Sequence, residues 1–304
     1  MSTLKTSADL LHKALQGNNR DQTFLDIVIT HDLIQRIEIA KLYQELYKKS
    51  LYEEIQSKLG GDFKELVGFL FLSPQEFSAK MLKKGFKGFS IDDELIFEIL
   101  SAHTLEEYNL IEEAYKSETK KDLKKDLEKY FSGSLKKAIL NLISTQRRLN
   151  PDPDMKLCEQ LCDELIKVEI KKWIDNEDLF KRIFIECSPE EMVLIGRFYY
   201  SKTGKSLIED IEKNLTGRNK NFLREILYNN IVPHELYAEK MYKSIKGLGT
   251  NTFLLNRCLA SRCRLDMPQI KEIYKWKYNT TLRKDIIGDC SGIYQKLCLY
   301  IAEC

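Results

Sequence analysis

Apolar residues recur at intervals of three and four along almost the whole chain, the spacing that gathers them on one face of an α-helix. Only six prolines interrupt this pattern, so we predict an all-α protein. In the last quarter of the chain, helix-starting and helix-ending residues are clear enough to place single helices. We expect five helices there, of which the first runs from Pro233 to about Ile245. The other four start at Asn251 or Thr252, at Pro268, at Thr280 or Thr281, and after Gly292.

A frame of four residue types returns four times: a tyrosine, a leucine eight residues later, an acid three beyond it, and a glycine seven after that. Its members are Tyr43, Leu51, Glu54 and Gly61; Tyr115, Leu123, Asp126 and Gly133; Tyr199, Leu207, Asp210 and Gly217; Tyr274, Leu282, Asp285 and Gly292. Successive copies are offset by 72, 84 and 75 residues. This register predicts a fourfold repeat of one five-helix unit, with copies at 8–73, 74–146, 154–231 and 232–304. We expect the tyrosines in the core and the acids in the first turn of each fourth helix, where a carboxylate offsets the helix dipole.

Composition and charge argue against several classes of function. The net charge of +2 on 304 residues gives no general attraction to nucleic acid. The longest strongly apolar stretch, 66–72, is too short to span a bilayer. Residues 1–9 hold no signal-peptide core, and the eight cysteines include no C-x-x-C pair, so we expect a cytoplasmic chain with reduced thiols. The four histidines have no ligand spacing, and no P-loop, G-x-G-x-x-G or nucleophile elbow occurs, which argues against an enzyme.

The candidate ligand-binding residues lie in the fourth copy. The run 245–250 reads Ile-Lys-Gly-Leu-Gly-Thr, and Asp289 follows forty residues after Gly249. Glycines in a tight turn between helices allow several carbonyl oxygens to point to one place, and a carboxylate from a second loop adds charge. Such a mixture of hard oxygens suits calcium, which accepts irregular shells of 6 to 8 ligands. The alternative is a plain helix terminator with Asp289 as a cap.

These residues make the chain resemble an annexin. The family pattern is a K-G-x-G-T loop between the first two helices of a repeat, followed near forty residues later by an acid within D-x-S-G, which appears here as residues 289–292. The resemblance implies four five-helix repeats packed into one slightly curved disk, with calcium bridging the protein to acidic phospholipid. It implies calcium ligands at the carbonyls of Ile245, Gly247 and Gly249 and the carboxylate of Asp289.

The other copies depart from this pattern. At the acid position they carry Lys58, Tyr130 and Asn214, and the second loop glycine of copy two is Ser90. We therefore expect three of the four sites of this type to be absent or weakened. A second, weaker calcium site is predicted from two carbonyls and side-chain acids in the loop formed by Leu59, Gly60, Gly61, Asp62 and Glu65.

Predicted membrane contacts are the loop-tip residues and the lysines beside them, namely Leu248, Lys246, Phe89, Lys87 and Trp173. For Phe89 and Trp173 the alternative is burial in the core. The degenerate early copies also look like the alpha-giardins, a divergent annexin group. We predict calcium-dependent binding to acidic phospholipid on the cytosolic face of membranes. The rival prediction is a scaffold that binds cytoskeletal protein, with calcium and lipid secondary.

Overall fold

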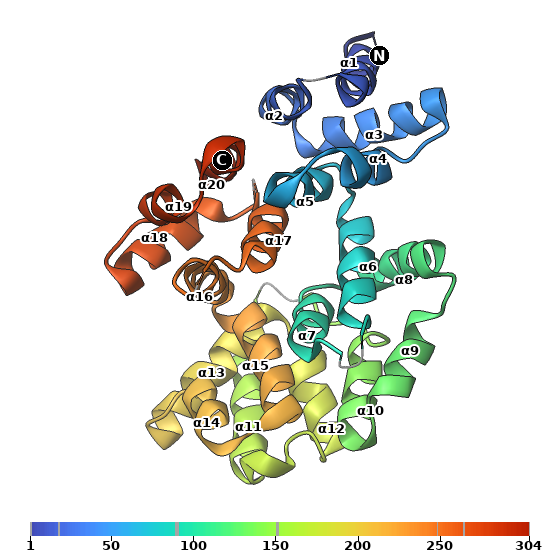
Figure 1. Cartoon of the computed structure of the whole chain (residues 1–304). Coiled ribbons are helices and arrows are strands. Elements are labelled where there is room, and N and C mark those ends of the chain that lie inside the picture. Colours follow the sequence, from blue (N-terminus) through green and yellow to red (C-terminus); the bar gives the residue numbers. More distant parts are fainter. Residues whose placement is uncertain are drawn as a thin grey trace. The chain divides into compact units, whose positions relative to one another are not determined.

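The structure is a computed structural model, and it describes residues 2–17, 19–88, 91–149, 152–247, 249–263 and 265–303. Twenty α-helices and no strands occur in these ranges (Figure 1). The predicted all-α class is therefore confirmed, and so is the count of five helices in each copy. None of the described helices has the length and apolar character needed to cross a membrane. The copies are called repeats I to IV below.

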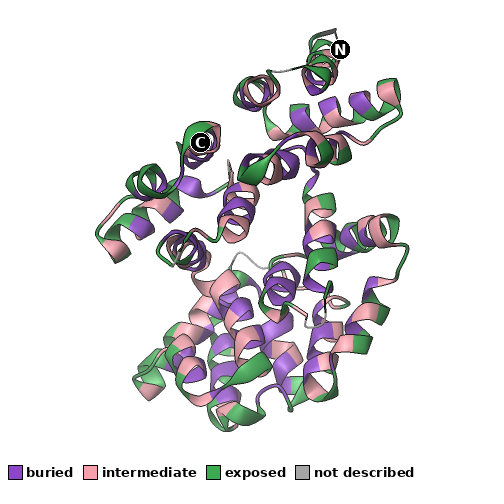
Figure 2. Cartoon of the chain, in the orientation of Figure 1, coloured by how far each residue is buried: buried purple, intermediate pink, exposed green. Residues whose placement is uncertain are grey.

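Repeats I and IV form one compact unit, made of residues 1–77 and 234–304. Repeat I contains α1 (Ser2–Gln16), α2 (Arg20–Thr30), α3 (Leu33–Tyr47), α4 (Leu51–Lys58) and α5 (Gly61–Leu70). Repeat IV contains α16 (Pro233–Ile245), α17 (Thr252–Arg262), α18 (Met267–Tyr278), α19 (Leu282–Asp289) and α20 (Gly292–Glu303). A single apolar core joins side chains from both repeats, with α17 packed on α5 and α2 on α20. Figure 2 colours the buried residues along the ribbon purple.

Repeats II and III form the other unit, residues 78–233. Repeat II contains α6 (Pro74–Gly85), α7 (Asp93–Ser101), α8 (Leu105–Thr119), α9 (Leu123–Tyr130) and α10 (Gly133–Leu142). Repeat III contains α11 (Met155–Ile166), α12 (Glu177–Phe180), α13 (Pro189–Thr203), α14 (Leu207–Asn214) and α15 (Gly217–Ile231). In repeat III a 3₁₀ turn occupies Ile170–Lys172, and α12 continues as a π-helix over Lys181–Ile185. This unit has the same internal arrangement, with α15 packed on α7.

The recurring tyrosine and acid are bonded to each other. In repeats II, III and IV the tyrosine hydroxyl donates to the acid at 2.7 Å, in the pairs Tyr115–Asp126, Tyr199–Asp210 and Tyr274–Asp285. All four tyrosines are buried, as predicted, and each acid lies in the first turn of its helix. Repeat I differs, because the hydroxyl of Tyr43 lies 3.1 Å from Nδ1 of His12. In repeats II, III and IV the hydrogen bond between the tyrosine and the acid therefore joins the third helix to the fourth.

The recurring glycine allows a left-handed backbone conformation at the start of each fifth helix. It is the first residue of the fifth helix in every repeat, with φ between 59° and 63° at Gly61, Gly133, Gly217 and Gly292. This left-handed conformation carries a steric cost for residues with a Cβ atom. The frame as a whole is therefore a folding device that fixes the turn between the fourth and fifth helices.

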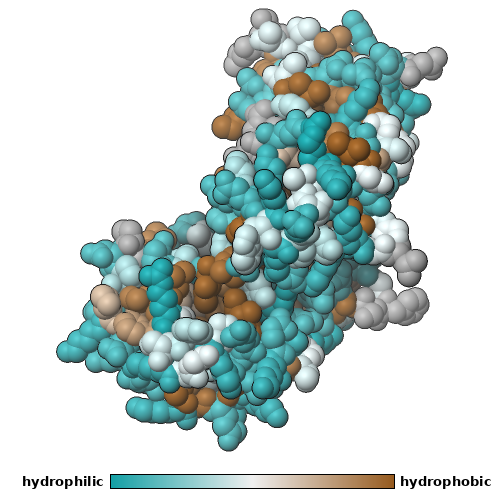
Figure 3. Space-filling model, turned by 90° about the vertical axis from the view of Figure 1, so that its left-hand side faces the viewer, coloured by the Kyte–Doolittle hydropathy of each residue, from teal (hydrophilic) through white to brown (hydrophobic). Residues whose placement is uncertain are grey.

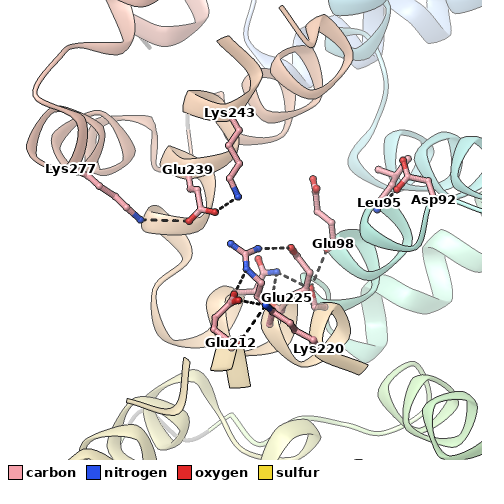
Figure 4. Close-up of polar contacts among 12 residues, drawn as sticks. Asp92, Leu95, Glu98, Glu212, Lys220, Glu225, Glu239, Lys243 and Lys277 are labelled. Atoms are coloured by element: carbon pink, nitrogen blue, oxygen red, sulfur yellow. Dashed lines mark hydrogen bonds and ion pairs between the residues drawn. The ribbon is translucent and has the colours of Figure 1, made fainter. Parts of the chain in front are cut away.

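Ion pairs brace helices on the polar surface of each unit. In the first unit, Glu239 on α16 pairs with Lys243 and, at 3.6 Å, with Lys277 on α18 (Figure 4). In the second, Glu212 on α14 pairs with Lys220 on α15 at 2.6 Å. The face shown in Figure 3 is mostly hydrophilic, with smaller hydrophobic patches.

Candidate calcium site in repeat IV

The loop between α16 and α17 is closed by its own backbone. The amide of Asn251 donates to the carbonyl of Ser244 at 2.7 Å, and the Asn251 side chain caps α17 by accepting from the amide of Leu254 at 3.0 Å. Gly249 adopts φ +83°, a conformation that favours glycine. In the described part of this segment, Lys246, Gly247 and Gly249 are exposed.

The structure brings this loop to the distant acid. The hydroxyl of Thr250 donates to the carboxylate of Asp289, the last residue of α19. Both Gly249 and Asp289 are exposed. Among the described residues, none donates a hydrogen bond to the carbonyls of Ile245, Gly247 or Gly249. The loop and the distant acid are therefore in contact through Thr250. The ligand roles of the three carbonyls and of Asp289 stay predictions.

A second link holds the loop to the frame, and the sequence reading missed it. Lys246 donates to the carboxylate of Asp285 at 2.9 Å, and Tyr274 donates to the same group. Burial alone would raise the pKa of Asp285, but the hydrogen bonds from Lys246 and Tyr274 hold it below its usual value. The Asp285 hydrogen bond in turn raises the pKa of Lys246. Lys246 was predicted to touch lipid; its side chain is exposed while its ammonium group pairs with Asp285, so the lipid contact stays a prediction.

The donor set fits a hard cation that accepts neutral oxygens. Nowhere in the described part of the chain do three or more His, Cys, Asp or Glu side chains gather as a metal cluster. A site here would rest on the three carbonyls, the carboxylate of Asp289 and added water, a combination typical of calcium ligands. Leu248, predicted at the tip of this loop, lies outside the described residues.

In repeat II an aromatic ring stands where repeat IV has its acid. The loop is closed in the same way, by the amide of Asp92 donating to the carbonyl of Gly85 at 2.9 Å. Asp92 also caps α7 through Leu95 (Figure 4). The ring of Tyr130 stacks on Phe86, with centroids 5.4 Å apart and planes at 22°. Tyr130 thus supplies no carboxylate at the position that Asp289 has in repeat IV.

Lys87, the basic residue predicted to contact the membrane beside this loop, is on the surface. Lys87 is exposed and forms no ion pair within the described ranges. Lys83, on the preceding helix, is paired with Glu118 at 2.7 Å. Phe89, predicted at the loop tip, lies outside the described residues.

In repeat III Trp173 is buried, which is the alternative that the sequence left open, so its predicted membrane contact is wrong. Its side chain is only 1% exposed, because the indole N–H donates to the carbonyl of Val168 at 3.0 Å and the ring packs against Phe184. An open groove of about 600 Å³ lies beside it. Asn214, at the acid position, donates to the carbonyl of Asp210 at 2.8 Å on its own helix.

In repeat I an arginine side chain reaches the backbone at the position that carries the acid in repeat IV. The guanidinium of Arg20 donates to the carbonyl of Lys58 at 2.7 Å. The Lys58 ammonium is 3.2 Å from Glu54, one turn earlier on α4. A positive side chain at this position opposes the binding of a second cation.

The second predicted calcium site has its acids directed to α17. Asp62 accepts from the hydroxyl of Thr252 at 2.8 Å, and Glu65 accepts from the amide of Asn256 at 3.0 Å. The carbonyl of Gly60 accepts from an amide of α5, and Leu59 is buried. Gly61 starts that helix. Both acids thus have hydrogen-bond partners on α17, and the second calcium site stays a prediction.

Comparisons with known proteins agree with this geometry. The annexin family model matches residues 6–70, 77–142, 162–226 and 237–301. Human annexin A3 is 31% identical over 289 residues, which are 95% of this chain and 90% of the relative. Chicken annexin A6 is 30% identical over 97% of this chain but only 44% of its own length.

Solved structures give the same result. A structure of annexin III, at 30% identity, superposes with a TM-score of 0.89 over 98% of this chain and 93% of that one. The calcium-bound structure of alpha-14 giardin has a TM-score of 0.79 over 98% of this chain and 99% of its own, at 17% identity. That identity shows the fold alone, so the narrower alpha-giardin assignment stays a prediction.

Proposed function

This chain belongs to the annexin family, whose members in general bind phospholipid membranes in a calcium-dependent way, and we propose that it does so chiefly through the repeat IV loop. The observation that carries the proposal is the contact between Thr250 and Asp289, which joins the carbonyl-rich turn to a carboxylate. Calcium bound there would supply positive charge to attract the phosphate groups of acidic lipids.

The chain's own residues have separate tasks in this proposal. The carbonyls of Ile245, Gly247 and Gly249 would hold the ion with Asp289. Lys246 anchors the loop to the frame through Asp285. Leu248 and Lys87 are proposed to touch the lipid surface, on the cytosolic face of the membrane. The proposal gives Trp173 no membrane contact, because the residue is buried.

The test is cosedimentation with phosphatidylserine vesicles over a calcium titration. Because Asp289→Asn removes the charged ligand, we expect it to need roughly tenfold more calcium or more for half-maximal binding. The matched control is Asp62→Asn, which removes one acid from the same unit and should leave the calcium requirement unchanged. An unaltered requirement in Asp289→Asn would refute the repeat IV assignment, and a raised one in Asp62→Asn would favour the second site.

The rival function has a distinct outcome in the same assay. Vesicle binding that ignores calcium, together with cosedimentation with microtubules or actin, would favour a cytoskeletal scaffold over the function proposed here.

A further inference from the structure

The groove beside Trp173 lies at the loop of repeat III that corresponds to the K-G-x-G-T loop of repeat IV. Asn176 caps the following helix through the amide of Leu179, as Asn251 does in repeat IV through the amide of Leu254. The two asparagines are 75 residues apart, which is the offset of the frame between these repeats. The two loops are therefore equivalent, and their side chains can be compared position by position.

In repeat III the backbone of this loop is folded on itself. The amide of Trp173 donates to the carbonyl of Ile170 at 3.2 Å, and its indole N–H donates to the carbonyl of Val168 at 3.0 Å. The carbonyl of Lys172 accepts from the amide of Asn176 at 3.0 Å. These carbonyls hold the turn together. Because calcium needs a shell of several oxygens, the loop of repeat III does not favour that ion.

Lysine side chains line the groove instead. Lys167, Lys171 and Lys205 all lie in its wall and are exposed. Lys205 is 3.7 Å from the carboxylate of Asp210, the frame acid of this repeat. In repeat IV the frame acid is paired with Lys246, the counterpart of Lys171. Lys205 thus serves the frame acid in repeat III, and within the described ranges neither Lys167 nor Lys171 forms an ion pair.

The acids that line the groove already have cationic partners. Asp210 pairs with Lys205, and Glu169 lies 3.2 Å from the ammonium group of Lys172. The charges of two lysines are therefore left uncompensated. The wall beside them is partly apolar and includes Ile166, which is 39% exposed. An anion of high charge attached to an apolar group would match both features.

We propose that this groove binds the phosphomonoester headgroup of an acidic lipid without calcium. Lys167 and Lys171 would donate charge-assisted hydrogen bonds to the phosphate oxygens, and Ile166 would lie against the apolar part of the lipid. A phosphomonoester carries a charge of about −1.5 to −2 at neutral pH, which matches the two lysines, whereas a diester phosphate carries less. A free phosphate ion would leave the apolar wall in water, so the lipid is favoured as its source.

The experiment is cosedimentation of the full chain, in excess calcium chelator, with phosphatidylcholine vesicles that contain phosphatidic acid. We expect binding, and weaker binding to phosphatidylserine vesicles of equal net charge. Lys167→Gln with Lys171→Gln should bind the phosphatidic acid vesicles roughly 25-fold more weakly, at about fivefold for each lysine. The matched control is Lys156→Gln with Lys213→Gln, which removes two exposed lysines of repeat III outside the groove lining. It should bind as the wild type does.

An equal loss in the control pair would mean diffuse attraction to the surface and would overturn the proposal. So would equal binding to the two kinds of vesicle, or no binding to phosphatidic acid. Inorganic phosphate, compared with sodium chloride at the same ionic strength, should not displace the protein, and displacement would identify a site for the free ion. Because calcium is absent throughout, this inference and the calcium function proposed for repeat IV succeed or fail separately.

Discussion

Repeats II and IV share one framework and differ in what they add to it. Both close the first loop with the same backbone hydrogen bond, at 2.9 and 2.7 Å, and both join the frame tyrosine to the frame acid at 2.7 Å. They differ at the end of the fourth helix, where Tyr130 stacks on its own loop and Asp289 meets Thr250. The scaffold of a repeat can therefore persist while its ligand set is replaced.

The frame acid gives the largest expected contrast between the two repeats. Asp285→Asn removes a buried carboxylate that serves both Tyr274 and Lys246, and we expect it to lower the free energy of unfolding by about 3 kcal/mol. Asp126→Asn replaces a carboxylate whose hydrogen-bond partner is Tyr115, and it should cost about half as much. Only Asp285→Asn should also raise the calcium requirement, because Lys246 loses its anchor. Urea unfolding and vesicle binding of both variants check this, and equal effects on calcium binding would contradict it.

The same pair predicts a pH dependence. Because the folded chain holds the pKa of Asp285 below its ordinary value, its contribution to stability is fully present above the ordinary aspartate range near pH 4. That contribution is lost as the pH falls through the lowered folded value. The stability difference between the wild type and Asp285→Asn should therefore shrink in acid. A difference that stays constant between pH 6 and pH 2 would speak against the carboxylate as its source.

A smaller effect is expected from repairing repeat II. Tyr130→Asp loses a ring stack worth about 1 kcal/mol and supplies a carboxylate, but the loop still lacks its second glycine. We expect no calcium response from this change alone. Combined with Ser90→Gly, in a chain carrying Asp289→Asn, it should restore calcium-dependent vesicle binding. A full response from Tyr130→Asp alone would mean that the second glycine is unnecessary.

The smallest contrast concerns the end of the third helix. Lys120 in repeat II has φ 61°, and its equivalent in repeat IV is Asn279 with φ 52°. Asparagine tolerates this left-handed conformation better than lysine. We therefore expect Lys120→Asn to stabilise the chain by about 0.5 kcal/mol and Asn279→Lys to destabilise it by a similar amount. Thermal unfolding of the two variants measures both signs, and shifts in the same direction would refute the explanation.

Local sequence signals were sufficient for the scaffold of repeat IV. The helix bounds at Pro233, Ile245 and Gly292 agree with the structure, because proline, glycine and capping residues act within one turn. The motif and its spacing also predicted that this loop lies near Asp289, and the contact between Thr250 and Asp289 agrees with that. These features depend on residues close in sequence or on a register that the repeat itself supplies.

Features that depend on tertiary contacts could not be read in this way. Burial of Trp173 depends on an acceptor at Val168 and on space left by the neighbouring helices. The reach of Arg20 to the carbonyl of Lys58 joins residues whose distance no periodicity reports. The link from Lys246 to Asp285 was hidden because an exposed loop lysine is read as a surface charge. Long flexible side chains and indole rings find partners that sequence spacing does not specify.

The division into two units sets an order of assembly during synthesis. Residues 78–233 are continuous, so every contact of that unit is available once its last residue has left the ribosome. The other unit joins the two ends of the chain, and its contact between Asp62 and Thr252 spans 190 residues. Domains generally fold as units while translation proceeds. We therefore expect part of the core surface of repeat I to stay uncovered until repeat IV emerges.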